Sequence, residues 1–87
     1  MFEKEYNVHR LIAVYSNKTE EILVEYKLLS FELESFQKEF SIRDKQNPMF
    51  ECYPIHKNNI SFIEQFIGYK IDWDFEGNSY FLEANQI

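Results

Sequence analysis

An acidic and aromatic stretch near the C-terminal end restricts the fold more than any other part of the chain. Residues 71–76 read Ile-Asp-Trp-Asp-Phe-Glu, so apolar and acidic side chains alternate. Because successive side chains of a strand point to opposite faces, this pattern predicts a strand with one apolar face and one row of carboxylates. Residues 77–79 read Gly-Asn-Ser and predict a tight turn, after which residues 80–83 form a returning strand. We therefore expect an exposed acidic hairpin here.

The size and composition of the chain favour one small, well-packed domain. The chain has 87 residues, below the usual domain size of roughly 100 to 150. Nine Phe, six Tyr and one Trp supply apolar surface for a core, and only two Gly and two Pro are present. This composition argues against disorder and against a long flexible linker. We expect a single domain over residues 1–87.

The first half of the chain predicts two strands and a helix. Apolar side chains alternate over residues 6–15 and again over residues 20–29, and the turn-forming residues 16–19 separate the two runs. After Ser30, a candidate N-cap, the apolar spacing changes to a helical one over residues 31–40. Strand, turn, strand and helix is the simplest interpretation.

The second half begins with a long irregular segment. Residues 41–58 contain both prolines and have no regular period, but their apolar residues predict a segment packed across the core. Asn58 or Asn59 can cap a second helix, for which residues 61–64 have capping-box spacing and Gly68 is a stop. With the acidic hairpin at the end, the order is ββααββ. Strands and helices do not alternate singly, so we expect an α+β fold with an antiparallel four-stranded sheet and two helices.

Charge points to the kind of partner. The chain contains nine Lys and Arg residues and fifteen Asp and Glu residues. Its last seventeen residues contain four acids and no base. Such a field opposes binding to nucleic acid and to anionic membranes, and it attracts a cationic protein surface. The alternative is that the net charge of −6 only aids solubility.

Cysteine use and hydropathy point to a compartment. Cys52 is the one cysteine, so no internal disulfide can form, and a reducing cytoplasm fits. We find no secretory signal and no apolar run near the roughly 18 residues of a membrane span. We expect a cytoplasmic protein, with Cys52 packed between its apolar neighbours.

Candidate chemistry is sparse. His9 and His56 could each act as a general acid or base, and Cys52 could be a nucleophile if it lay near His56, but none of them lies in a catalytic motif. Asp72 and Asp74 could bind a divalent cation, although a metal needs more oxygen ligands than this run supplies. We therefore expect a chain that is not an enzyme and holds neither metal nor cofactor.

Two segments resemble a known group of proteins. Residues 47–55, Asn-Pro-Met-Phe-Glu-Cys-Tyr-Pro-Ile, and the ending from Asp74-Phe75 to Tyr80-Phe81-Leu82-Glu83 are similar to small proteins of bacterial polymorphic toxin systems, including immunity proteins of contact-dependent growth inhibition. The resemblance implies a cytoplasmic protein, alone or as a heterodimer with its toxin. It also implies that the protein blocks a sibling toxin domain, commonly a nuclease.

The leading hypothesis is an immunity protein that binds a basic toxin surface. We expect recognition at Asp72, Asp74, Glu76 and Glu83, with Tyr80 as an adjoining anchor. If these acids are not the binding surface, segment Asp44–Asn58 is the next candidate. The alternatives are an adaptor domain without a toxin, and a small enzyme using His9 or His56.

Overall fold

A long antiparallel hairpin forms one half of the sheet. The computed structural model describes residues 8–86, where β1 (Val8–Ser16) pairs with β2 (Ile22–Lys27). The turn between them is closed by the hydroxyl of Ser16, which accepts hydrogen bonds from the backbone N–H groups of Lys18 at 3.1 Å and Thr19 at 3.2 Å. The two predicted strands and their turn are confirmed; residues 6 and 7 of the first lie outside the described part.

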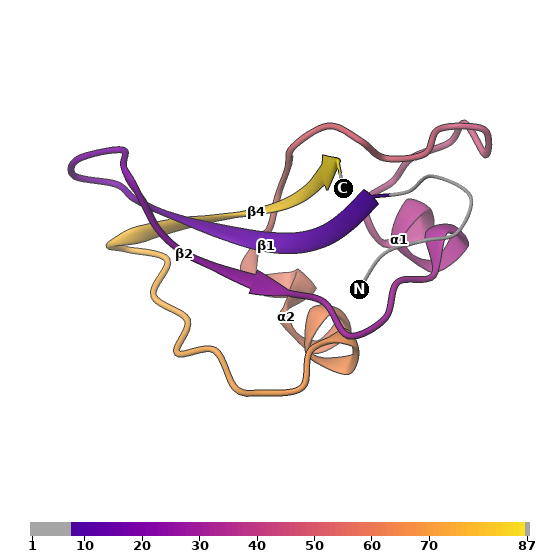
Figure 1. Cartoon of the computed structure of the whole chain (residues 1–87). Helices are drawn as coiled ribbons and strands as arrows, with labels where there is room; N and C mark the ends of the chain where they lie inside the picture. The colour runs from indigo at the N-terminus through magenta and orange to yellow at the C-terminus, as the bar shows by residue number, and fades with distance from the viewer. Residues whose placement is uncertain (1–7, 87) are drawn as a thin grey trace.

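The C-terminal strand completes the sheet by pairing with the first. β4 (Asn78–Gln86) runs antiparallel to β1 along its whole length, from Val8 opposite Gln86 to Ser16 opposite Asn78. β3 (Tyr53–Pro54) is a short strand on the other side of β4, so the order across the sheet is β2-β1-β4-β3. Figure 1 shows the three longer strands of this sheet, β2, β1 and β4. The expected α+β fold with a four-stranded antiparallel sheet and two helices is confirmed.

The predicted acidic hairpin is wrong. Residues 71–74 are irregular and residues 75–77 form a turn, so β4 has no partner strand in this segment. The edge of β4 is already occupied, because Tyr53 and Pro54 pair with it and the N–H of Ile55 donates to the carbonyl of Tyr80 at 2.8 Å. Since β3 also separates the helices, the order is ββαβαβ and differs from the predicted ββααββ.

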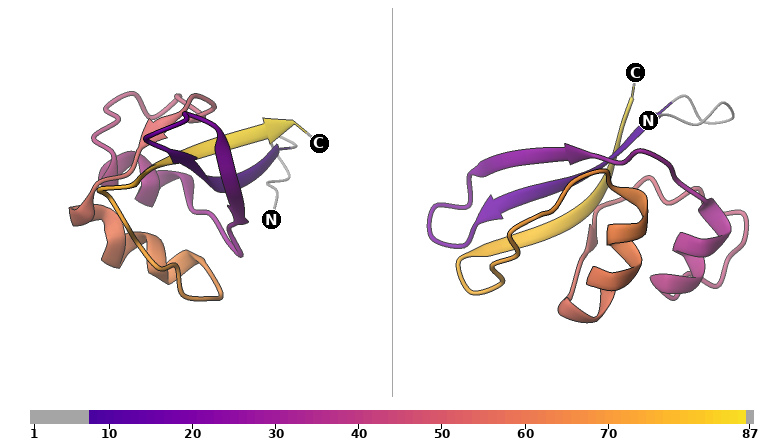
Figure 2. Two further views of the ribbon diagram at one scale, coloured as in Figure 1. Left: turned by 90° about the vertical axis from the view of Figure 1, so that its left-hand side faces the viewer. Right: turned by 90° about the horizontal axis from the view of Figure 1, so that it is seen from below.

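Both helical segments cover one face of the sheet (Figure 2). α1 (Leu33–Glu39) is shorter than predicted, and its N-cap is Glu32 and not Ser30. The second helical segment consists of η1 (Lys57–Asn59), α2 (Ile60–Ile63) and η2 (Glu64–Phe66). Its capping box joins His56 to Asn59, whose Oδ1 accepts from the His56 N–H at 2.8 Å, so the predicted box at residues 61–64 is wrong.

The core lies between this helical layer and the sheet. Phe36 of α1 is 0% exposed, and four rings surround it at centroid distances of 4.2 to 6.4 Å: Phe31, Phe40, Phe62 and Phe66. The sheet contributes alternate residues of its two central strands: Ile12, Val14, Tyr80 and Leu82. Burial of these apolar groups is the main stabilising term for so small a chain.

The central segment is pinned to the core by two buried polar side chains. Arg10 of β1 is 0% exposed, and its guanidinium donates to the carbonyls of Met49 at 2.6 Å and Pro48 at 2.8 Å. Gln37 of α1 donates to the carbonyl of Asn47 at 2.7 Å. Met49 and Ile55 are buried, so the expected packing is confirmed for these two residues, whereas Phe50 is 45% exposed.

Candidate partner-binding surface

The acidic stretch keeps its two-sided character without being a strand. Ile71 is buried, Trp73 and Phe75 are half-buried against the core, and three carboxylates between and beyond them are exposed: Asp72, Asp74 and Glu76. The sequence pattern therefore correctly separated the side chains that face the core from those that face solvent, although the segment is not a strand. We call residues 72–76 the acidic-aromatic surface.

The two aromatic residues of this surface stack on each other and pack against a buried tyrosine. The rings of Trp73 and Phe75 are nearly parallel, with centroids 5.7 Å apart. Tyr80 lies against both, at 4.8 Å from Trp73 and 4.9 Å from Phe75, and only 3% of it is exposed. Tyr80 is therefore part of the core and does not lie at the surface as the predicted anchor would. Its role here is to support the exposed residues.

Asp74 organises the backbone of the surface. Its Oδ1 accepts from the N–H groups of Glu76 at 3.2 Å and Gly77 at 3.1 Å, as in an Asx turn. Its own N–H donates to the hydroxyl of Tyr80 at 2.8 Å, and its carbonyl accepts from Asn78 at 3.0 Å. A Cβ on Gly77 would lie 2.8 Å from Asp74 Oδ2, so a larger residue at this position would displace the Asp74 carboxylate.

The hairpin between β1 and β2 holds the turn from the other side. The N–H of Asn17 donates to the carbonyl of Gly77 at 2.9 Å, and its side-chain amide donates to the carbonyl of Glu76 at 3.2 Å. The hydroxyl of Ser79 donates to the Asn17 side chain. Sequence reasoning missed this role of Asn17, because residues 16–19 show only turn formers and carry no sign of a contact about sixty positions away.

A hollow of about 300 Å³ opens at this surface. Its lining combines aromatic, acidic and apolar side chains with one cation: Lys57, Ile60, Trp73, Asp74, Phe75 and Glu76. A guanidinium or ammonium group is attracted both by the face of an aromatic ring and by a carboxylate. The aromatic rings and carboxylates of this lining are groups that attract a cation, whereas Lys57 opposes one.

Glu83 does not belong to this surface. β4 turns Tyr80 and Leu82 toward the core, so Glu83 lies on the opposite face of the sheet. There its carboxylate accepts from the hydroxyl of Tyr15 at 2.9 Å. This hydrogen bond, followed by burial, raises the pKa of Tyr15. The prediction that Glu83 lies with the other three acids is wrong, because it assumed a two-stranded hairpin.

Cys52 is exposed, so its predicted packing is wrong. It precedes β3, where Tyr53 rather than Cys52 turns toward the core. Partial burial, and then the charge of Glu83, raise the pKa of the Cys52 thiol. The reactive thiolate is consequently less populated at neutral pH than in an ordinary exposed cysteine.

Neither histidine lines the hollow at the acidic-aromatic surface. His9 is half-buried on β1. His56 is exposed and lines another hollow of about 290 Å³ with Glu39 and Ser41, but Asn59 donates to the Glu39 carboxylate at 2.8 Å. Within residues 8–86, His, Cys, Asp and Glu side chains form no group of three or more that could hold a metal ion. No helix in this range is long and apolar enough to cross a membrane.

The Asx turn predicts different effects for two substitutions of Asp74. Asp74→Ala removes the acceptor of two N–H groups and should lower the free energy of unfolding by about 1 to 2 kcal/mol. Asp74→Asn keeps Oδ1 and should change it by less than about 0.5 kcal/mol. Urea unfolding at pH 7 measures both, with the exposed Asp72→Ala as control. Equal losses for Asp74→Ala and Asp72→Ala would contradict the structural role of Asp74.

Comparison with known proteins places the chain in a family. Residues 9–83 match a family described as a domain of unknown function, DUF7683. No curated protein matches the chain. No solved structure matches it. Because the match covers β1 through most of β4, the chain belongs to the DUF7683 family.

Proposed function

We propose that this chain is a protein-binding domain that neutralises a cationic toxin through its acidic-aromatic surface. One observation carries the proposal: exposed carboxylates flank a stacked, half-buried Trp73 and Phe75 at the rim of a hollow. A lysine or arginine of the partner can place its cation over the aromatic face, an interaction of about 0.5 to 2 kcal/mol. The neighbouring carboxylate adds a charge-assisted hydrogen bond.

The surface is fixed before any partner arrives. Tyr80 and Asn17 hold its backbone from two different parts of the sheet, and Trp73 donates to the carboxylate of Glu64 at 3.3 Å. A rigid surface loses little conformational entropy on binding, so more of the contact energy appears as affinity. This pre-ordering favours a binding role over a merely solvated acidic segment.

Two further observations support a toxin as the partner. The net charge is −6, and an enzyme that acts on nucleic acid presents a basic surface that such a field attracts. The segments at residues 47–55 and 74–83 resemble immunity proteins of polymorphic toxin systems. The proposed domain blocks its toxin by occupying that basic surface.

A growth assay tests the toxin role. A candidate toxin domain, taken from a gene that neighbours the gene of this protein, is expressed in a bacterial host, with and without the chain. We expect growth to be restored by the wild type and by a control variant, Glu34→Gln with Asp44→Asn and Glu51→Gln. The variant Asp72→Asn with Asp74→Asn and Glu76→Gln should protect poorly. Absence of protection by the wild type, at expression levels equal to those of the toxin, contradicts the role.

Binding kinetics test the surface itself. The Asp72, Asp74 and Glu76 variant should associate with the purified toxin domain at least about tenfold more slowly at low salt, because electrostatic steering is reduced. The difference should shrink at 0.5 M salt, since the screening length is already about 10 Å at 0.1 M. The Asp74→Asn substitution keeps the acceptor of the turn, so folding is unaffected.

The control variant makes the kinetic result specific. It changes the net charge by the same amount through exposed acids away from the surface: Glu34, Asp44 and Glu51. Loss of binding in the control but not in the surface variant would transfer recognition to segment Asp44–Asn58. Binding without protection of growth would identify an adaptor domain.

A further inference from the structure

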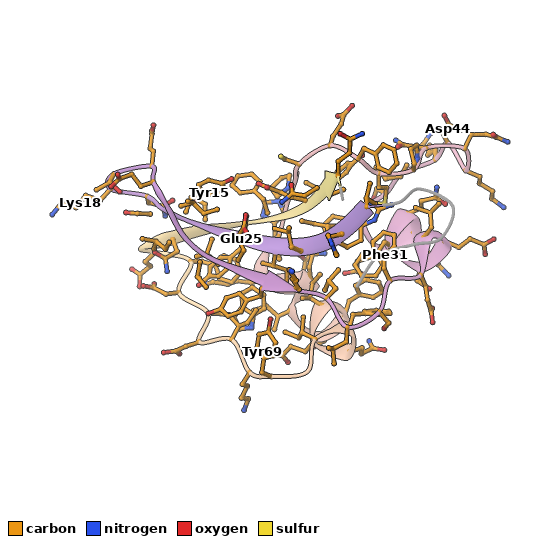
Figure 3. All side chains as sticks on the ribbon, in the orientation of Figure 1. Tyr15, Lys18, Glu25, Phe31, Asp44 and Tyr69 are labelled. Carbon is orange, nitrogen blue, oxygen red and sulfur yellow. The ribbon has the colours of Figure 1, made fainter. Side chains whose placement is uncertain are left out.

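Exposed apolar side chains gather along one edge of the sheet. Ile22, Leu23 and Val24 of β2 are 48%, 56% and 39% exposed. Leu29, just beyond β2, and Tyr69, which packs against Tyr26, are exposed as well. These residues account for five of the six large apolar side chains that are exposed in the described part. We call the stretch Ile22–Tyr26 the β2 edge; Figure 3 shows Tyr69 below it.

Within residues 8–86, no strand pairs with the outer side of the β2 edge. β2 is the terminal strand of the sheet, with β1 as its one neighbour among the described strands. The N–H of Leu28 donates inward to Arg10, and Val24 and Tyr26 pair opposite Val14 and Ile12. Because backbone groups alternate in direction along a strand, those of Glu25 point outward. An exposed apolar edge strand of this kind is a template for another strand.

One end of the edge is already covered. The hydroxyl of Tyr69 donates to the carbonyl of Lys27 at 3.4 Å, and Phe66 accepts from the N–H of Leu29 at 2.8 Å. The contact of Tyr69 also confirms that the backbone of Lys27 faces outward. The backbone hydrogen bonds of a strand that adds to the edge are therefore limited to residues before Lys27, whereas the side chain of Lys27 remains exposed.

The charges at the two ends of β2 indicate which strand can pair with its outer edge. Glu20 and Glu21 precede the apolar run, and Lys27 follows it. Suppose that β2 of a second copy pairs antiparallel with this strand, with the two Val24 residues opposite each other. Glu21 of each copy then lies beside Lys27 of the other. A parallel copy would set like charges side by side, which destabilises strand pairing. The edge is thus complementary to itself under a two-fold axis, as a symmetric dimer interface must be.

We propose that the β2 edge pairs antiparallel with the β2 edge of a second copy of this chain, so that two four-stranded sheets become one continuous sheet. The pairing covers Ile22, Leu23 and Val24 in both copies. It leaves residues 72–76 uninvolved, so it stands independently of the toxin-binding role.

Sedimentation equilibrium of the full chain from about 1 to about 500 μM tests this pairing. We expect a reversible monomer–dimer equilibrium. In the antiparallel register centred near Val24, Leu23 lies opposite Glu25 of the second copy. Leu23→Glu should therefore raise the dimer dissociation constant at least about tenfold, because it sets two carboxylates side by side. Gln46→Glu, with the same charge change at an exposed loop site, should leave it unchanged. Circular dichroism verifies that each variant is folded.

A charge swap tests the antiparallel arrangement. Glu21→Lys sets two lysines side by side and should weaken the dimer about threefold to tenfold, and adding Lys27→Glu should restore it. A monomer at every concentration, an unchanged dimer in Leu23→Glu, or no restoration in the double variant would overturn the proposal. A monomer whose Glu25 amide becomes protected from exchange only with a different protein would also overturn it, in favour of strand addition by that partner.

Discussion

Replacement of Arg10 by Met is expected to lower the free energy of unfolding by about 3 kcal/mol. The guanidinium is fully buried and donates to two backbone carbonyls of the central segment, those of Pro48 and Met49. Met fills a similar volume but has no donor, so both carbonyls lose a charge-assisted hydrogen bond. The loss is a large fraction of the roughly 5 to 15 kcal/mol that is usual for a folded domain.

Arg10→Lys separates the two contributions of the guanidinium. Lysine keeps the charge but has no planar fork that reaches both carbonyls, and it loses the stacking over the Phe31 ring, whose centroid lies 4.1 Å from the guanidinium carbon. We expect about 2 kcal/mol of destabilisation in urea unfolding. The control is Arg43→Met, at an exposed position, with a change below about 0.5 kcal/mol. If Arg10→Met is as stable as the Arg43 control, Arg10 does not pin the central segment.

Truncation of Phe36 is expected to be the most damaging change in the core. Phe36→Ala should cost about 4 kcal/mol, because it removes a fully buried ring that contacts four others from three different segments of the chain. The cavity it leaves lies between the two helical segments. This variant therefore lies close to the stability limit of so small a domain.

Phe36→Leu keeps the effect measurable. It preserves most of the volume, and we expect a loss of about 1 to 2 kcal/mol in urea unfolding followed by the fluorescence of Trp73. Leu29→Ala, at an exposed position, is the matched control and should change stability by less than about 1 kcal/mol. Equal losses at positions 36 and 29 would contradict a core centred on Phe36.

Local sequence rules predicted the elements that depend on neighbouring residues. The β1–β2 hairpin follows from two alternating runs joined by turn formers, and Ser16 closes that turn with hydrogen bonds from residues two and three positions further on. The same alternation separated the buried Ile71 and half-buried Trp73 from the exposed acids of residues 72–76. Each of these outcomes rests on contacts within a few positions, so the amino-acid order alone encodes it.

The structure differs from the predicted site at positions whose location depends on pairing between distant strands. β4 could have paired with residues 71–76, but β1 and β3 occupy its two edges, and this moved Glu83 to the other face of the sheet and Tyr80 into the core. In the sequence, Arg10 interrupts the apolar face of a predicted strand. In the folded chain its buried guanidinium donates hydrogen bonds to two backbone carbonyls that lie 38 and 39 positions away. The alternation of apolar and polar residues determines which side chains share one face of a strand. Which strand pairs with it, and which segment packs on each face, depends on parts of the chain that meet only after folding.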